Sequence, residues 1–308
     1  MPKISLLILL LELYINIGLI EYTYALSSNI TNTVIYFIKN LVLISSIISL
    51  IIGSTVGLSQ IKIKRLLAYS TISHLGFILL ALAINTEQSI ESLLFYIIQY
   101  SITNFNIFLI IIALGLFIKS GIQNKVEDND SYNTNLSHHY LNGARGSGAG
   151  EEFEGTEKDI QYIIELKGLF FKNPILSLSL SICLFSMAGI PPLIGFFSKQ
   201  FVLYAAIQKG FYFISIVAII VSIISASYYL TVIKILHVGG TTPTPATKWM
   251  VSRGYIDSKI TSDKTNYEIS SIHSFIISTL TISILLFILK PSLLFSSTSV
   301  LSLTLFYF

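Results

Sequence analysis

The sequence predicts an all-α integral membrane protein, a bundle of about seven transmembrane helices in which one helix is broken by prolines. Three observations lead to this fold class. Hydrophobic residues make up 53% of the 308 positions and charged residues only 11%, whereas a soluble domain has about 25% charged residues. Apolar stretches of about 20 residues, the length that crosses a hydrocarbon core of about 30 Å, recur along the chain. Lysine and arginine gather in loops that would share one side of the membrane.

The apolar stretches define four membrane segments within residues 1–118 and three within residues 174–308. The seven lie at about 4–20, 34–56, 66–84, 93–118, 174–207, 211–236 and 272–289. The fifth segment is long and is interrupted at Pro191 and Pro192, so we expect two half-helices there. The apolar tail 292–308 is short and follows Pro291, so we expect it to lie at the membrane interface rather than to span.

Two polar connections, 119–173 and 239–270, separate these segments. The middle of the first, 142–152 (NGARGSGAGEE), has no periodicity and few apolar residues, so we expect disorder there. The same connection holds His138 and His139, which are better explained as solvated loop histidines than as a metal site. The basic residues that follow the second, fourth and sixth segments would lie on the inner side of the membrane. Lys209 and Lys290 would lie on the outer side.

Helical spacing singles out small and polar residues inside the segments. Ser49, Gly53 and Gly57 are four residues apart on the second segment, a spacing that lets helices approach closely in lipid. The fourth segment carries polar side chains on a single helical face. These are Ser92, Tyr96, Gln99, Thr103 and Asn106. They would make ordinary interhelical hydrogen bonds, or else Gln99, Thr103 and Asn106 would support the wall of a polar, water-bearing path.

Lys199 is the strongest candidate for a functional ionisable residue. A charge at the middle of a bilayer costs about 2.5–3.5 kcal/mol on insertion scales, so such residues need a reason. Lys199 follows a predicted helix break formed by Gly189, Pro191, Pro192 and Gly195. Unwound backbone at that depth is tolerated where it is buried in protein or lines a cavity, and transporters use such breaks to build ion sites. The pattern therefore favours a buried lysine at an ion or proton site.

Three further ionisable residues lie in predicted membrane segments. His74 is in the third segment, with Ser70 one turn earlier. Imidazole titrates near neutral pH, which suits proton relay, and a satisfied core histidine is the alternative. Lys3 and Glu12 share the first segment but are nine residues apart, on opposite helical faces. Each of these two therefore needs its own partner or a wet environment, and Glu12 would support the polar path together with the residues of the fourth segment.

Two stretches, and their order along the chain, resemble the antiporter-like membrane subunits of respiratory complex I. Residues 60–77 (QIKIKRLLAYSTISHLGF) and 187–199 (MAGIPPLIGFFSK) look like two signatures of that family. Residues 1–5 (MPKIS) resemble the family's segment that bears another lysine. The resemblance covers almost the whole chain apart from the two polar connections. It corresponds to the C-terminal half of the family's fourteen-helix fold.

The resemblance implies a function and a set of site residues. The chain would be part of an enzyme, the proton-translocating NADH:ubiquinone reductase, and would move protons while electrons pass from NADH to ubiquinone. Lys199, Lys3 and His74 would be proton-path residues. NAD, FMN, iron–sulfur clusters and ubiquinone would be bound by, or shared with, other subunits. The partners would be other membrane-arm subunits and the lipid bilayer, with no nucleic acid, in the mitochondrial inner membrane.

The residues leave other functions open. The chain has no glycine pattern of a dinucleotide-binding fold, and its one cysteine is too few for a cysteine-ligated cluster. A subunit of a multi-subunit sodium/proton antiporter would share the motifs but not the redox partners. A seven-helix receptor would need the opposite orientation in the membrane. A truncated, non-pumping structural fragment also fits, because the chain begins at its first segment where the family has seven further helices.

Overall fold

The structure is a computed structural model that describes Ser5, Ile8, Leu9, Glu12 and the ranges 29–136, 162–238 and 271–307. Every element in those ranges is helical, and an isolated bridge between Lys62 and Tyr162 is the one β-type pairing among them. The elements are α2 (Asn29–Leu58), α3 (Ile63–Ile84), α4 (Glu87–Leu136), η2 (Ile163–Leu166), α5 (Leu169–Lys172), α6 (Pro174–Ala188), α7 (Ile194–Gln208), α8 (Tyr212–His237), α10 (Ser271–Leu286), η3 (Phe287–Leu289) and α11 (Ser292–Tyr307).

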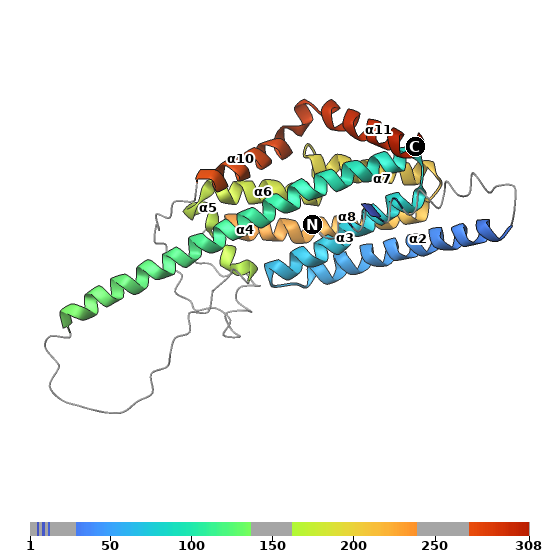
Figure 1. The fold of residues 1–308 in the computed structure, drawn as a ribbon. Helices are drawn as coiled ribbons and strands as arrows, with labels where there is room; N and C mark the ends of the chain where they lie inside the picture. Colours follow the sequence, from blue (N-terminus) through green and yellow to red (C-terminus); the bar gives the residue numbers. More distant parts are fainter. Residues whose placement is uncertain are drawn as a thin grey trace.

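The long helices lie side by side in a bundle (Figure 1). Within the described ranges, four stretches are long and apolar enough to cross a membrane: Tyr36–Leu58, Ile63–Ile84, Glu87–Leu116 and Tyr212–His237. Helices α6 and α7 follow one another along the bundle, and α10 and α11 do the same. The predicted fold class, an all-α membrane bundle with a proline-broken helix, is confirmed.

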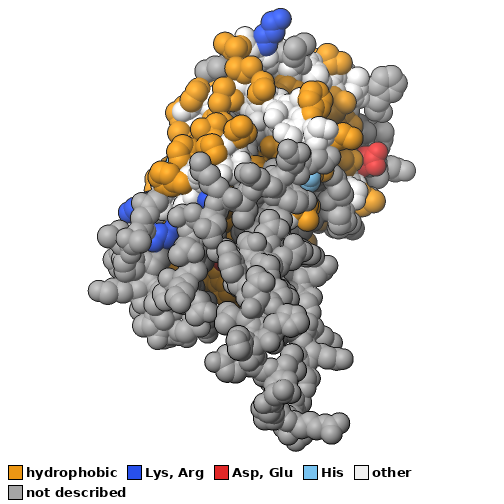
Figure 2. Space-filling view, turned by 90° about the vertical axis from the view of Figure 1, so that its left-hand side faces the viewer, with side chains coloured by type: hydrophobic (Ala, Val, Ile, Leu, Met, Phe, Trp, Pro, Cys, Tyr) orange, Lys and Arg blue, Asp and Glu red, His pale blue; other side chains and the backbone are white. Residues whose placement is uncertain are grey.

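The described surface of the bundle is strongly apolar. Hydrophobic side chains predominate where described residues reach the surface in Figure 2. On α2 and α8, Phe37 is 67% exposed and Phe213 is 72% exposed. Apolar surface of this extent belongs against lipid or against a partner protein.

Helices α2 and α3 pack closely because α2 carries small residues on the facing side. A Cβ atom placed on Gly53 would lie only 2.5 Å from the amide nitrogen of Ser73, so glycine alone permits this approach. One turn further on, a Cβ on Gly57 would lie 3.3 Å from the ring of Tyr228 on α8. The prediction that these two glycines let neighbouring helices approach is confirmed.

Helix α4 is longer than predicted at both ends. It begins at Glu87 because Thr86 and Ser89 cap it: the Thr86 amide donates to Ser89 Oγ at 2.7 Å, and the Ser89 amide donates to Thr86 Oγ1 at 3.2 Å. It continues to Leu136 and extends past the bundle (Figure 1). The prediction of a loop is therefore wrong for 119–136, a stretch without proline that has little to stop a helix.

The last part of that predicted loop folds as well. Residues 162–172 form η2 and α5, and both short helices pack against α8. Tyr162 pairs with Lys62, whose Nζ lies 5.4 Å from the centroid of the tyrosine ring. Residues 137–161, with His138 and His139, lie outside the described residues, as do residues 239–270.

The C-terminal tail differs from its prediction. Helix α10 and η3 together match the predicted segment 272–289, but the tail forms α11, which packs along α4. Figure 1 shows α10 and α11 meeting at an apex near the α6–α7 connection, so α11 continues the path of α10 toward the other end of the bundle. Pro291 lacks an amide donor and interrupts the helix there, and Phe295 then packs back on Phe95, with ring centroids 5.1 Å apart. Lys290, predicted at the outer side, lies at this apex.

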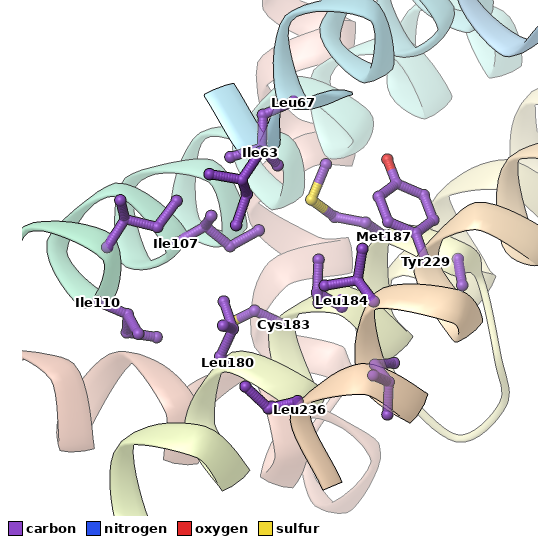
Figure 3. Packing of buried hydrophobic residues seen from close by; sticks show 14 of the residues in the cluster. Ile63, Leu67, Ile107, Ile110, Leu180, Cys183, Leu184, Met187, Tyr229 and Leu236 are labelled. Atoms are coloured by element: carbon purple, nitrogen blue, oxygen red, sulfur yellow. The ribbon is translucent and has the colours of Figure 1, made fainter. Parts of the chain in front are cut away.

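Two hydrophobic clusters fill the bundle. The first joins α3, α4, α6, α8 and α10 and includes Cys183, Met187 and Tyr229, which Figure 3 shows with their neighbours. The second joins α2, α3 and α4 to α7 and α8 and includes Phe77 and Tyr96. The candidate site described next lies where these two clusters meet.

Candidate functional site

The predicted helix break is present between α6 and α7. Helix α6 ends at Ala188, and Gly189 takes the left-handed conformation, with φ of 84°. Its amide donates to the carbonyls of Phe185 and Ser186, both at 3.1 Å. Helix α7 restarts at Ile194 after Pro191 and Pro192. A Cβ on Gly195 would overlap the Ser186 carbonyl, so the two half-helices are pressed together at the break.

The amino group of Lys199 is held by the end of α6. Its Nζ donates to the carbonyl of Met187 at 2.9 Å and to that of Ala188 at 3.1 Å. The C-terminal end of a helix carries partial negative charge and free carbonyls, so the break itself supplies the partner for the ammonium group. The ring of Phe77 on α3 adds a cation–π contact, with 5.8 Å from Nζ to the ring centroid. Lys199 is only 7% exposed, as predicted for a lysine buried within the bundle.

The side chain of His74 is buried in a hydrogen-bonded group from three helices. Its Nδ1 shares a hydrogen bond of 2.7 Å with the hydroxyl of Tyr96 on α4, and its Nε2 one of 3.3 Å with the hydroxyl of Tyr229 on α8. The Tyr229 hydroxyl also hydrogen-bonds Ser70, one turn before His74 on α3. Both imidazole nitrogens therefore have a hydroxyl partner that is able to donate or accept a proton.

Lys199 and His74 are brought into one region but are not hydrogen-bonded to each other in the described part of the chain. The ring of Phe77 contacts the surroundings of both groups. It lies under Lys199 and stacks on Tyr96, with ring centroids 5.9 Å apart. Proton transfer between the two groups would therefore need a water molecule or a side-chain movement past this ring.

The polar face of α4 lies against α6 and α7. Gln99, Thr103 and Asn106 are all buried, as their shared helical face predicts. Ser198, the neighbour of Lys199, donates to Gln99 Oε1 at 3.3 Å, and Gln99 Nε2 lies 3.5 Å from Thr103 Oγ1. The side-chain hydroxyls and amides thus extend from beside Lys199 along α4.

Further along this face, the polar contacts are incomplete. Asn106 Nδ2 donates to Cys183 Sγ at 3.2 Å, but Asn106 Oδ1 is buried without a partner among the described residues. A buried amide oxygen without a protein partner is a good position for an ordered water. Hydrogen bonds between helices are thus present along this face, and a water-bearing wall stays a prediction.

Some predicted site residues are not placed with this group. Lys3 lies outside the described residues, so its part in the site stays a prediction. Glu12 is described as a helical, exposed residue, and its supporting role in the polar path is likewise a prediction. Within the described ranges, no three His, Cys, Asp or Glu side chains lie together as metal ligands.

The structure adds residues that sequence reasoning missed. Tyr229 completes the surroundings of His74, and Ser198 joins Lys199 to the face of α4. One signal was available for Tyr229, because tyrosines in membrane helices favour the interfaces and this one lies well inside an apolar helix. The signal for Ser198 was only its position next to Lys199.

Comparisons with known proteins agree on one family. The family described as NADH:quinone oxidoreductase/Mrp antiporter, TM matches residues 5–225. NADH-ubiquinone oxidoreductase chain 2 of Rhizopus oryzae is 46% identical over 275 residues, which are 87% of this chain and 46% of that protein. NADH-quinone oxidoreductase subunit N of Hydrogenovibrio crunogenus is 32% identical over 199 residues, 65% of this chain and 34% of that protein.

Solved structures share the fold. A chain of respiratory complex I from Thermus thermophilus superposes with a TM-score of 0.55 at 20% identity, covering 83% of this chain and 45% of that one. A chain of the Mrp complex from Dietzia sp. superposes with a TM-score of 0.61 at 19% identity, covering 87% and 47%. The chain spans about half the length of the curated relatives it matches, or less.

Proposed function

This chain belongs to the NADH:quinone oxidoreductase/Mrp antiporter membrane family, and from that membership we propose that it is part of the proton-translocating subunit 2 of respiratory complex I. The names of its curated relatives support this choice, since several are NADH-ubiquinone oxidoreductase chain 2 or the bacterial subunit N. In the whole assembly the chain would pass protons across the membrane while electrons move from NADH to ubiquinone.

The observation that carries the proposal is the buried position of Lys199 and the contacts of its amino group. An ammonium group buried in an apolar bundle is held by main-chain carbonyls at a helix break and by no carboxylate among the described residues. Such a group is able to lose its proton without leaving an unpaired buried anion behind. A lysine is almost never fully buried unless it is paired, so one held without a carboxylate points to a functional role.

We propose that protons reach and leave this group through side chains of the chain itself. Lys199 holds a proton against the carbonyls of α6 and exchanges it with the outer side. His74, with the hydroxyls of Tyr96 and Tyr229 at its two nitrogens, passes protons along the middle of the bundle. Lys3 continues this central path, and Glu12, Gln99, Thr103 and Asn106 support it with polar contacts.

We also propose the membrane, the topology and the neighbouring subunits of this chain. We place it in the mitochondrial inner membrane with seven spans, in which α6–α7 and α10–α11 each form one interrupted span and the basic loops face the matrix. Other membrane-arm subunits of complex I would be its neighbours. NAD, FMN, iron–sulfur clusters and ubiquinone would be bound by, or shared with, those subunits. A cluster held by four cysteines would need more than the one cysteine of this chain.

The test is the substitution Lys199→Met in the assembled complex, reconstituted in vesicles. Methionine keeps the length of the side chain but removes the proton-carrying group. We expect the complex to assemble and proton uptake per NADH oxidised to fall. The matched control is Lys209→Met, an exposed lysine at the end of the same helix. Unchanged proton transport in Lys199→Met would remove this residue from the mechanism.

A second candidate function is a subunit of a sodium/proton antiporter. The family includes Mrp antiporters in its description, and the fold of a chain of an Mrp complex is matched with a TM-score of 0.61. The two functions differ in what drives transport. Transport that needs a sodium gradient and ignores NADH would favour the antiporter, and NADH-driven proton uptake in sodium-free medium would favour complex I.

A further inference from the structure

The apex between α10 and α11 carries a lysine on its outer surface. Lys290 follows η3 and is exposed, and its neighbour Leu289 is 72% exposed. Apolar side chains lie exposed on both sides of it, Leu285 on α10 and Val300 on α11. Lys290 is thus a charge at the helix connection, with exposed leucines before it, the exposed Ser292, Ser296 and Ser297 directly after it, and Val300 further along α11.

Ring contacts fix the depth of this lysine in the bundle. Phe287, three residues before it, lies 5.7 Å from Phe197 between ring centroids. Phe295, five residues after it, lies 5.1 Å from Phe201. Phe197 and Phe201 are the residues of α7 that flank Lys199, just after the helix break. Lys290 is therefore at the level of the break, and Figure 1 shows the same correspondence between the α10–α11 apex and the α6–α7 connection.

Lipid is not a suitable neighbour for an ammonium group at that level. Half of a hydrocarbon core of about 30 Å separates it from the nearer headgroup region, and a four-carbon side chain is too short to cross that distance. Membrane proteins turn such charges toward protein or toward a water-filled cavity. The break adds a further requirement, since interrupted backbone in the hydrocarbon region must be covered by protein.

The described part of this chain does not supply that cover. Lys290 forms no ion pair and no cation–π contact with any described residue, although the same chain pairs Lys199 with carbonyls and with Phe77. Charge complementarity then indicates which kind of partner would contact Lys290. The partner needs an acidic side chain at mid-depth on an otherwise apolar helix.

We propose that the α10–α11 apex is a docking surface for a transmembrane helix of a neighbouring subunit that presents an aspartate or glutamate to Lys290. The exposed leucines that precede Lys290, Leu285, Leu286 and Leu289, pack against the apolar part of that helix. The proposal concerns assembly and not proton transfer, so it stands or falls independently of the role of Lys199.

Photo-crosslinking in the membrane-embedded assembly tests it. A benzophenone amino acid replaces Leu289, and the control carries it at Ile223, which is 64% exposed on α8. We expect Leu289 to capture a membrane-helix peptide of another subunit that contains an aspartate or glutamate, and Ile223 not to capture it. Capture of lipid alone, of a helix without an acidic residue, or of a helix of the same polypeptide would overturn the proposal.

Charge variants complete the test. Lys290→Glu should reduce capture of that peptide severalfold, and Lys290→Arg should retain it, because only the first places like charges together. Exchange of the captured acidic residue for lysine should then restore capture in the Lys290→Glu background. A yield that is the same in Lys290→Glu as in the parent would show that charge does not hold the contact. If the Leu289 variant fails to accumulate, the photoreactive group at Leu286, 44% exposed, replaces it.

Discussion

At the scale of single residues, the site is built from titratable groups whose hydrogen-bond partners are neutral. Main-chain carbonyls face Lys199, and tyrosine hydroxyls face His74. Neither arrangement contains a permanent counter-charge among the described residues. Changing the charge of either group therefore leaves no stranded carboxylate, which is a requirement for a site that gains and loses protons in a low-dielectric setting.

The hydroxyl of Tyr96 should matter for proton movement through His74. Tyr96→Phe removes the 2.7 Å hydrogen bond and leaves Nδ1 of a buried imidazole without a partner. Leaving a buried group unpaired costs about 1–3 kcal/mol, so we expect NADH-driven proton uptake to slow about tenfold or more. The measurement is the initial rate of acidification in reconstituted vesicles. Tyr204→Phe, an exposed tyrosine on α7, is the control and should change nothing. Equal rates in both variants would exclude Tyr96 from the path.

The candidate site was predictable from sequence only for residues whose type is unusual in a membrane helix. Lys199 and His74 stand out because charged and titratable side chains are rare there, and Gln99, Thr103 and Asn106 stand out by their spacing. Their partners do not stand out. Every residue has a main-chain carbonyl, so those of Met187 and Ala188 do not stand out in the sequence. Only the fold brings these two to Nζ of Lys199. Tyr229 lies more than 150 residues from His74, at a separation that a local pattern does not report.

At the scale of elements, the break between α6 and α7 positions the side chain of Lys199. Glycine at 189 lets the chain turn with φ of 84°, and glycine at 195 lets α7 start against α6. The result is a helix end whose carbonyls point at the first turns of the next helix. A continuous helix would have used those carbonyls in its own hydrogen bonds.

The conformation of Gly189 gives a matched pair of variants. Gly189→Ala places a side chain in left-handed backbone, at a cost of about 1–2 kcal/mol, and puts its Cβ 3.1 Å from Cδ of Lys199. Gly210→Ala carries the same strain, with φ of 84°, but its Cβ meets nothing within 4 Å. We expect similar losses of thermal stability in the two variants and reduced proton uptake only in Gly189→Ala. Full transport in Gly189→Ala would mean that Lys199 does not depend on this close fit.

Element ends were harder to predict than element positions. Segments with long apolar runs, such as α3 and α8, were placed within a few residues. Helix α4 ran past its apolar part because helix formation ends at a stop signal and not at a change in polarity. The tail after Pro291 was judged by its length alone, whereas its aromatic contacts with α4 and α7 decide where it lies.

At the scale of the whole molecule, charged residues lie at both ends of the helix bundle. Arg65 lies at the start of α3 and Lys209 at the end of α7, at opposite ends of the bundle (Figure 1). The fold class followed from composition, and the side of the membrane on which each end lies stays a prediction from loop charge. The packing of one helix on another did not follow, because it depends on contacts such as Gly53 on Ser73 that only the fold reveals.

Sidedness is open to direct measurement with thiol reagents. Native Cys183 is buried, so it contributes little background labelling. Arg65→Cys and Lys209→Cys should react with a membrane-impermeant maleimide from opposite sides of sealed vesicles, Arg65→Cys from the matrix side and Lys209→Cys from the other. Labelling of both from one side would contradict the proposed arrangement of spans.

The depth of Lys199 also has an electrical consequence. In a bilayer centred on the helix break, a proton that binds this amino group from either side crosses about half of the membrane voltage. Moving a full unit charge across 100 mV is worth about 2.3 kcal/mol, so half the distance is worth about 1.2 kcal/mol. The ratio of charged to neutral Lys199 then changes about sevenfold for each 100 mV. Under the proposed role of Lys199, its protonation therefore responds to the membrane voltage, and protonation from the negative side becomes harder as the voltage rises.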